Sequence, residues 1–121
     1  MKYLLLVYGQ ESDWANLTPE QNAAMMQEYG QFAQEITQKG KNLGSNRLKP
    51  VATATTVRIR DGKRLITDGP FAETKEQLGG YFLVEANDLD EAISIAARIP
   101  AARHGSVEVR PIFTMEQAAG R

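Results

Sequence analysis

The sequence predicts an α+β fold, in which a small antiparallel sheet carries two helices on one of its faces. Segments 2–8, 81–85 and 107–113 are short and rich in β-branched, aromatic and leucine side chains, as strands are. Segments 18–39 and 88–99 carry apolar residues at helical spacing, which is typical of amphipathic helices. The chain has 121 residues, the size of one domain. We therefore expect one domain over residues 1–121.

The first strand is predicted over residues 2–8. Alternation divides its apolar side chains into Leu4 and Leu6 on one face, and Tyr3, Leu5 and Val7 on the other. A strand that is apolar on both faces is expected to be covered on both faces. The apolar run is too short for a signal peptide or a membrane span. The polar residues 9–17 that follow predict a loop.

The first helix is predicted over residues 18–39. Thr18 is the expected N-cap, Pro19 stands at the first helical position, and Gln21 completes a capping box. Gly40 follows the helix, where a glycine commonly ends it. One apolar stripe runs along the helix, formed by Met25, Tyr29, Phe32 and Ile36.

The middle of the chain predicts a hairpin. Residues 41–53 show no clear pattern, although Leu43 and Leu48 could flank a short strand. Two arms, 53–60 and 64–68, are joined by Asp61-Gly62, a strong hairpin-turn signal. A sharp loop is expected after the second arm, where Gly69 and Pro70 stand together.

The last third of the chain predicts a strand, a helix and a final strand. Gly79-Gly80 precede the strand 81–85 and mark a bulge or a close backbone approach rather than a dinucleotide site. Asp88 is the expected N-cap of the helix 88–99, and Pro100 marks its end. The helix has one apolar stripe, formed by Ala92, Ile95, Ala96 and Ile99. The final strand is predicted over residues 107–113.

This order of elements fits a ferredoxin-like β-α-β-β-α-β fold with both helices on one face of an antiparallel sheet. The uncovered face would then carry an apolar set, namely Tyr3, Leu5, Val7, Tyr81, Leu83 and Ile112. An apolar face of this size is expected to be covered. We therefore predict a homodimer packed sheet against sheet with C2 symmetry. The alternative is that the C-terminal tail, whose last residues 116–121 are expected to be frayed, folds over that face.

Composition excludes several classes of function. The chain has no cysteine, which excludes disulfides, thiolate nucleophiles and cysteine-ligated metals, and one histidine, which excludes a histidine-rich metal site within one chain. Its net charge is -1, which gives no electrostatic reason to bind nucleic acid or an anionic membrane. We therefore expect a cytoplasmic protein with no metal, no cofactor, no nucleic-acid partner and no membrane partner.

Residues 68–93 read DGPFAETKEQLGGYFLVEANDLDEAI, and Val107 to Pro111 read VEVRP. Together with the N-terminal MKYLLLVY, these motifs resemble the YCII-related family, in its DGPF-domain branch. The resemblance covers nearly the whole chain. It implies a dimeric α/β-barrel built on the ferredoxin-like fold. The branch has no established activity, and its members are often found alongside extracytoplasmic-function sigma factors.

The wider family has a proposed acid–base site, consisting of a histidine on the first helix and an aspartate near the end of the second. This sequence has no histidine between Thr18 and Lys39, and the second helix ends in Ala97-Arg98-Ile99-Pro100. The family's proposed residue pair therefore has no counterpart here, and the sequence leaves open whether the chain is an enzyme.

Asp68 is the candidate catalytic residue. A carboxylate at the end of a strand, before Gly69-Pro70, can project into a cleft as a general base or an orienting group. The alternative is that its oxygens accept backbone N–H groups within the turn.

Arg110, Tyr81 and Tyr3 are the candidate substrate-binding residues. Arg110 could bind an anionic group bidentately, or it could form a salt bridge to Glu108 of a neighbouring strand or chain, or to Asp68. The two tyrosines could line a cleft, or they could fill an interface core with their hydroxyls at its wet edge. We therefore expect a small-molecule cleft between the sheet face and a partner chain. The alternative function is a non-catalytic protein-interaction module, linked to sigma-factor-dependent transcription.

Overall fold

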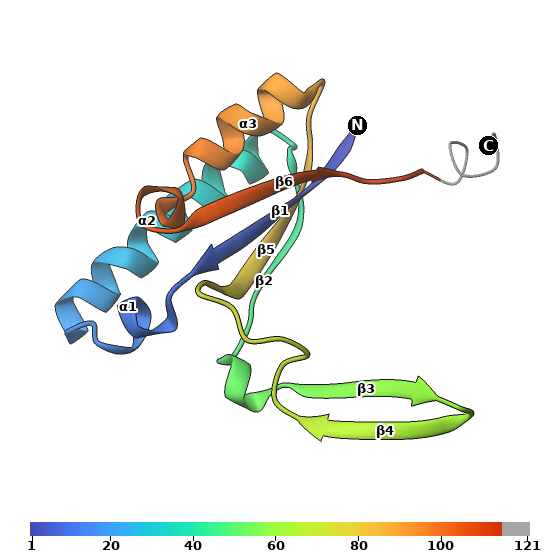
Figure 1. Ribbon diagram of the computed structural model, residues 1–121. Helices are drawn as coiled ribbons and strands as arrows, with labels where there is room; N and C mark the ends of the chain where they lie inside the picture. The colour runs from blue at the N-terminus through green and yellow to red at the C-terminus, as the bar shows by residue number, and fades with distance from the viewer. Residues whose placement is uncertain (115–121) are drawn as a thin grey trace.

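The computed structural model describes residues 1–114 and has an α+β architecture with an antiparallel four-stranded sheet (Figure 1). The strand order is β2-β5-β1-β6, and the long helices α2 and α3 lie on one face of this sheet. This arrangement is consistent with the predicted ferredoxin-like fold. The strands are β1 (Lys2–Gly9), β2 (Asn42–Arg47), β3 (Thr55–Arg60), β4 (Lys63–Asp68), β5 (Gln77–Glu85) and β6 (Ser106–Pro111). The α-helices are α1 (Glu11–Ala15), α2 (Pro19–Gln38) and α3 (Leu89–Ala97), and two 3₁₀ turns are η1 (Val51–Thr53) and η2 (Pro100–Arg103).

The central strand β1 pairs with β5 on one side and with β6 on the other, and its two faces differ in burial. The expectation that Tyr3, Leu5 and Val7 face away from the helices is wrong. These three side chains are buried in the core with residues of both long helices. A strand that is apolar on both faces does not reveal from its own sequence which face the helices cover.

The face of the sheet opposite the long helices is formed by the other alternating set. Leu4 lies opposite Leu83 and Leu6 lies opposite Tyr81, so these four side chains share this face and are half-buried. The predicted positions of Tyr81, Leu83 and Ile112 on this side are thus consistent with the pairing, since Arg110 lies opposite Leu4 two residues before Ile112. We refer to this surface as the open sheet face.

Helix α2 begins and ends as the sequence predicts. The Thr18 hydroxyl accepts a hydrogen bond from the Gln21 backbone, and the Gln21 side chain accepts one from the Thr18 backbone, which forms the capping box. Gly40 follows the helix with a φ of 70°, a left-handed conformation that glycine adopts at little cost. The second half of the helix packs on the sheet through Phe32 and Ile36. The Phe32 ring meets the Phe82 ring edge to face, with centroids 5.0 Å apart.

Helix α3 also confirms its predicted cap and stripe. The Asp88 carboxylate accepts a hydrogen bond from the Glu91 backbone N–H at 2.9 Å. The predicted apolar stripe is buried, namely Ala92, Ile95, Ala96 and Ile99. The chain then makes the short turn η2 at Pro100, where the sequence predicts the end of the helix.

Two elements differ from the sequence prediction. Residues 9–17 were expected to be a loop, but they contain the short helix α1, which is too brief to show an apolar stripe. The polar segment Asn42–Arg47 forms the edge strand β2, so the second strand of the sheet lies in the region without a clear pattern. The predicted hairpin exists as β3 and β4, but it forms a separate two-stranded sheet. The expected frayed residues 116–121 lie outside the described residues.

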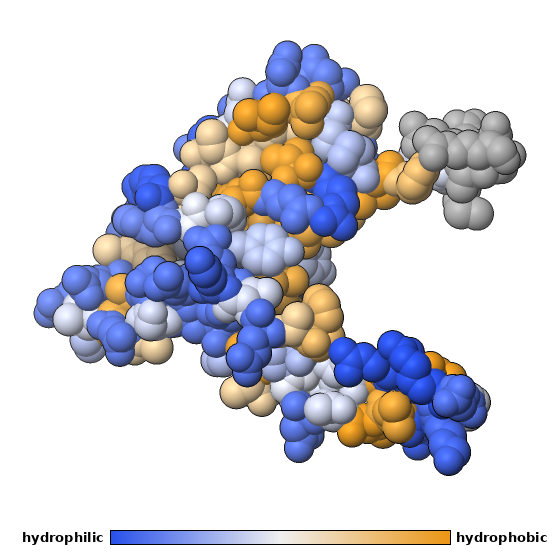
Figure 2. Space-filling model, viewed as in Figure 1, coloured by the Kyte–Doolittle hydropathy of each residue, from blue (hydrophilic) through white to orange (hydrophobic). Residues whose placement is uncertain are grey.

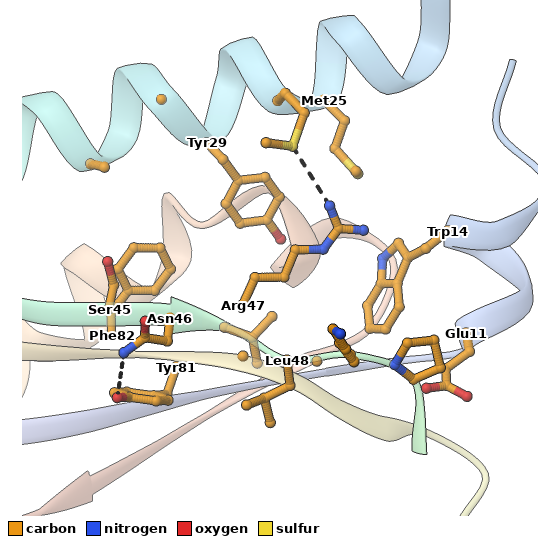
Figure 3. Close-up of a pocket in the computed structure, with 18 of the residues that line it drawn as sticks. Glu11, Trp14, Met25, Tyr29, Ser45, Asn46, Arg47, Leu48, Tyr81 and Phe82 are labelled. Carbon is orange, nitrogen blue, oxygen red and sulfur yellow. Dashed lines mark hydrogen bonds between the residues drawn. The ribbon is translucent and has the colours of Figure 1, made fainter. Parts of the chain in front are cut away.

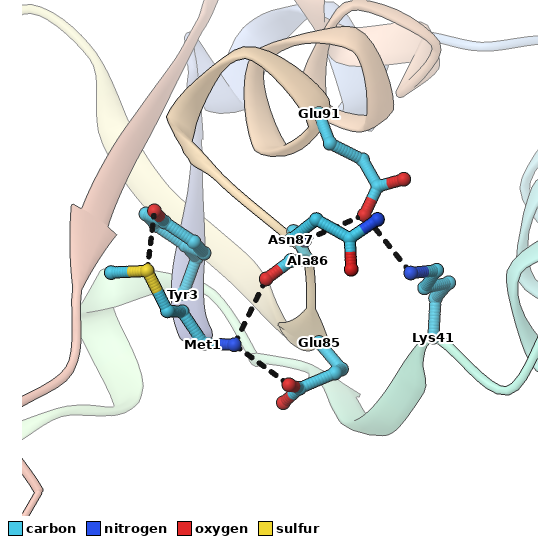
Figure 4. Close-up of polar contacts among 7 residues, drawn as sticks. All are labelled: Met1, Tyr3, Lys41, Glu85, Ala86, Asn87 and Glu91. Carbon is cyan, nitrogen blue, oxygen red and sulfur yellow. Dashed lines mark hydrogen bonds and ion pairs between the residues drawn. The ribbon is translucent and has the colours of Figure 1, made fainter.

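Polar contacts join the start of the chain and the start of β2 to the segment that enters α3 (Figure 4). The Met1 ammonium group donates to a Glu85 carboxylate oxygen at 2.7 Å and to the Ala86 carbonyl at 2.9 Å. The Lys41 ammonium group lies 2.9 Å from a Glu91 carboxylate oxygen, which also accepts from the Asn87 backbone N–H at 2.8 Å. These contacts fix both edges of the loop between β5 and α3.

The Glu91 contacts predict an acid-dependent part of the stability. The Asn87 backbone hydrogen bond and the Lys41 ammonium group lower the pKa of Glu91 below its ordinary value. The stabilisation is therefore complete above the unfolded pKa of about 4.3 and is lost as pH falls through the lower folded pKa. We expect Glu91→Gln to lower the midpoint of thermal unfolding at neutral pH and to have a smaller effect at pH ~3. A midpoint difference that is the same at both pH values would contradict this assignment.

Among residues 1–114, none of the helices combines the length and apolar character that crossing a bilayer requires.

Candidate functional site

A cavity of about 560 Å³ lies between the middle of α2 and the β2–β5 edge of the sheet. Helix α1 and the residues that follow β2 complete its walls (Figure 3). Val7, Gly80 and Phe82 line it from the sheet, which places it on the side of the sheet that carries the helices. The cavity forms because α2 buries Phe32 and Ile36, whereas Met25 and Tyr29, which lie nearer its N-terminus, are only half-buried.

The Trp14 indole forms the α1 wall of the cavity and lies directly against two glycines. A Cβ atom at Gly79 would come within 2.6 Å of the indole ring, and one at Gly9 within 2.8 Å. Any side chain at either position would therefore displace the ring. Helix α1 is anchored as well, since the Glu11 backbone N–H donates to the Gln77 side chain and the Glu11 carboxylate accepts from the Val51 backbone. The cavity thus has an aromatic wall whose position the surrounding backbone fixes.

Arg47, the last residue of β2, brings a positive charge to this cavity. Its guanidinium extends toward α2 and α1, and Nη1 lies 3.8 Å from the Met26 sulfur (Figure 3). Among the described residues it forms no ion pair with a carboxylate, whereas Arg98, Arg103 and Arg110 each do. The thioether is a weak acceptor and cannot neutralise the charge. Arg47 is therefore available to an anion that enters the cavity.

Tyr29 adds a hydroxyl to the same cavity. Burial raises the pKa of Tyr29 above its ordinary value, although a backbone hydrogen bond at Ala101 and the charges of Arg47 and Arg103 act in the opposite direction. The phenol therefore stays protonated well above neutral pH and can donate a hydrogen bond there. The cavity thus combines two cations, Arg47 and Lys49, with a neutral hydroxyl and an apolar wall, and its one carboxylate, Glu11, accepts from the Val51 backbone.

The four residues predicted from the sequence are distributed over different parts of the molecule. Asp68 is exposed at the end of β4, and Arg110 is paired with Glu108 on the open sheet face. The alternative for Arg110 was a salt bridge to Glu108 of a neighbouring strand or chain, whereas this salt bridge lies within β6. Neither Asp68 nor Arg110 lines the cavity, and no hydrogen bond or ion pair joins them within residues 1–114. Their proposed roles stay predictions.

The two predicted tyrosines lie on opposite faces of the sheet. Tyr81 contributes to the rim of the cavity, and its hydroxyl accepts a hydrogen bond from the Asn46 side chain at 2.8 Å (Figure 3). Tyr3 is 2% exposed in the core, where its hydroxyl lies 3.8 Å from the Met1 sulfur. Tyr3 is therefore not accessible to a ligand in this chain, because the helices cover its face of the sheet.

Sequence reasoning missed the residues that line the cavity. Arg47 stands in a polar edge strand, Trp14 in a five-residue helix, and Tyr29 in a stripe that reads as ordinary core. One signal in the sequence could have found Trp14. It is the single tryptophan of the chain, and it lies in the segment 9–17, which the sequence predicts to be a loop. An aromatic side chain of this size in a polar segment indicates a ring that packs on something distant in the sequence.

Comparison with known proteins gives a family but no activity. Residues 1–116 match the YCII-related domain. An uncharacterized protein of Rhizobium meliloti (strain 1021) is 37% identical over 114 residues, which cover 93% of this chain and 92% of that protein. Because both matches extend over almost the whole chain, the protein described above is a member of the YCII-related family.

Proposed function

We propose that the cavity binds a small organic anion, with its acidic head on Arg47 and its apolar body against Trp14 and the methionines of α2. One observation carries the proposal, namely that the Arg47 guanidinium enters an otherwise largely apolar cavity without a carboxylate partner among the described residues. Arginine matches carboxylates and phosphates with two parallel hydrogen bonds. A volume of about 560 Å³ is in the range of small-molecule sites.

The remaining polar groups support the orientation of such a ligand. Tyr29 can donate a second hydrogen bond to the acidic head or to a neighbouring oxygen, because its hydroxyl stays protonated. Asn46 is less available, since its side chain already donates to Tyr81. The ligand class is therefore a monoanion or dianion of modest size with a flat or branched apolar part. Asp68 and Arg110 act in this scheme only if a partner chain brings them to a second cleft, as the sequence predicts.

The test is a binding screen on the full chain by isothermal titration calorimetry. The panel contains aromatic carboxylates, branched-chain carboxylates and phosphate monoesters, each beside its neutral amide or alcohol analogue. We expect at least one anion to bind and its neutral analogue to bind at least tenfold more weakly. Arg47→Gln should weaken binding by roughly ten- to a hundredfold, the loss of one charge-assisted hydrogen-bond pair.

Arg60→Gln is the matched control, because Arg60 is an exposed arginine of the hairpin outside the cavity. It should bind the anion as the parent chain does. Equal binding by Arg47→Gln and the parent chain would exclude Arg47 as the anchor. If no anion of the panel binds, the alternative function as a non-catalytic interaction module becomes the better proposal.

A further inference from the structure

Met26 brings a sulfur atom to the rim of the cavity between α2 and the β2–β5 edge. It follows Met25 in α2, and both methionines line the cavity. Met26 is 49% exposed, whereas Met25 is half-buried. The surface at this end of the molecule is largely hydrophilic, as the space-filling view over α1 and the first turns of α2 shows (Figure 2). The Met26 side chain is therefore open both to the cavity and to solvent.

The Met26 sulfur contacts the guanidinium on which the proposed anion site depends. Nη1 of Arg47 lies 3.8 Å from this sulfur, a contact that Figure 3 draws as a dashed line. It is the one hydrogen bond of the Arg47 side chain within residues 1–114. A thioether is a weak acceptor, so the guanidinium keeps its donors for a ligand. The oxidation state of this sulfur therefore bears directly on the charge that a bound anion would use.

Methionine is the only sulfur-containing residue type of this chain, which has four methionines and no cysteine. Because no thiolate competes, a peroxide that reaches this protein meets thioethers as its sulfur targets. Met1 is also exposed, at 58%, but it does not line the cavity, and its sulfur accepts a hydrogen bond from the Tyr3 hydroxyl. Among residues 1–114, Met26 is therefore the methionine that is both exposed and in contact with Arg47.

Oxidation of Met26 would turn a weak contact into a strong one. Hydrogen peroxide transfers one oxygen atom to the thioether, which loses two electrons and becomes a sulfoxide. The O–O bond breaks, and the second oxygen leaves with both hydrogens as water. The sulfoxide oxygen carries a partial negative charge and is a good hydrogen-bond acceptor. Since the sulfur lies 3.8 Å from Nη1 of Arg47, an oxygen added on that side comes within hydrogen-bond distance of the guanidinium.

We propose that Met26 is an oxidation site that controls anion binding at Arg47. The consequence for binding rests on the proposed function, because it is a change in the affinity of the cavity for an anion. In the thioether form, the guanidinium is free to bind the acidic head of the ligand. In the sulfoxide form, the Met26 side chain competes with that head for the same N–H groups. Methionine sulfoxide reductases, one class for each sulfoxide epimer, remove the oxygen and restore the site.

The first measurement needs no ligand. The full chain is treated with hydrogen peroxide, and tandem mass spectrometry of the peptide that contains both methionines of α2 follows their oxidation. We expect Met26 to be oxidised at least about fivefold faster than the less exposed Met25. The ¹⁵Nε–Hε signal of Arg47 in the NMR spectrum should shift on oxidation of the parent chain. It should not shift in Met26→Leu, which has no sulfur at this position.

Calorimetry then tests the consequence for binding, with benzoate, 3-methylbutanoate and phenyl phosphate as probes. A probe that binds the parent chain should bind the oxidised chain roughly tenfold more weakly, and reduction by methionine sulfoxide reductases should restore the affinity. Met26→Leu should bind as the parent chain does, before and after peroxide, although its other methionines and Trp14 meet the same oxidant. Met26→Gln places an amide oxygen near the guanidinium and should bind weakly without oxidation. Met25→Leu is the matched control and should stay sensitive to peroxide.

The outcomes separate this proposal from the proposed function. Equal affinities of the oxidised and reduced parent chain, or peroxide sensitivity that persists in Met26→Leu, would overturn the control of binding and leave the anion site intact. If no probe binds the parent chain, the anion site fails and the control of binding fails with it. A shifted Arg47 signal would in that case still establish the sulfoxide contact. An unchanged Arg47 signal, or equal oxidation rates for Met25 and Met26, would overturn the oxidation site itself.

Discussion

Replacement of Gly105 by alanine should destabilise the protein by about 3 kcal/mol, at the upper end of overpacking effects. An added Cβ atom at this position would lie 2.1 Å from the Tyr8 carbonyl oxygen and 3.0 Å from the Gly9 Cα. Both atoms belong to the backbone, so no side-chain rotation relieves the clash. Gly105 also donates its N–H to the Ala101 carbonyl at 2.7 Å, which holds the turn in place. The turn and β1 would have to separate where β6 begins.

Thermal unfolding measures this effect, and we expect the midpoint to fall by roughly 10 °C or more for a domain of this size. Gly44→Ala is the control, because no atom lies within 4 Å of the position that its Cβ would take. It should leave the midpoint almost unchanged. A similar fall for both variants would mean that glycine flexibility, and not the close approach to Tyr8, determines the result.

Leu5→Ala should cost about 3–4 kcal/mol, as expected for a fully buried leucine. Leu5 is 0% exposed and lies between Phe82 and Val109 in the register of the sheet. The neighbouring Leu4 lies on the open sheet face and is half-buried, so Leu4→Ala should cost less than about 1.5 kcal/mol.

Urea unfolding of both variants compares the two faces of one strand. Measurements at several protein concentrations separate loss of packing within the chain from loss of association, since only the latter depends on concentration. A larger loss for Leu4→Ala at every concentration would mean that the faces of β1 are assigned the wrong way round.

The sequence predicts those elements whose ends are determined by local chemistry. The Thr18–Gln21 capping box, the Asp88 cap and the Asp61-Gly62 turn each depend on residues close in sequence, and all three exist. The edge strand β2 reads NLGSNR, which has neither the alternation nor the β-branched residues of a strand. Its pairing with β5 depends on contacts between residues far apart in the chain, such as Asn46 and Tyr81, which are 35 residues apart, so local sequence cannot reveal it.

Local sequence also cannot reveal which face of β1 the helices cover or which residues line the cavity, because both depend on packing between elements far apart in the chain. Tyr3, Leu5 and Val7 are as apolar as the other side of β1, and only the packing of α2 and α3 distinguishes the two sides. The cavity gathers Trp14, Tyr29 and Arg47 from three elements, and each of these residues is unremarkable where it stands in the sequence. A carboxylate at the end of a strand before Gly69-Pro70 predicts a site at Asp68, whereas the structure places this residue exposed at the base of the hairpin.

The β2–β5 pairing determines where this chain can change in length or sequence without loss of the main sheet. The β2–β5 ladder ends at the hydrogen bond from the Leu48 backbone N–H to the Gly79 carbonyl, which is 2.9 Å long. Leu48 and Gly79 are therefore neighbours in space, although about thirty residues separate them in the chain. Residues 49–76 lie between these two positions and contribute no strand to the four-stranded sheet. This segment can therefore be lengthened, shortened or changed in sequence while the four strands stay paired and the two long helices stay packed on the sheet. A change of length between residues 49 and 76 would therefore leave the pairing of the four main strands unaltered.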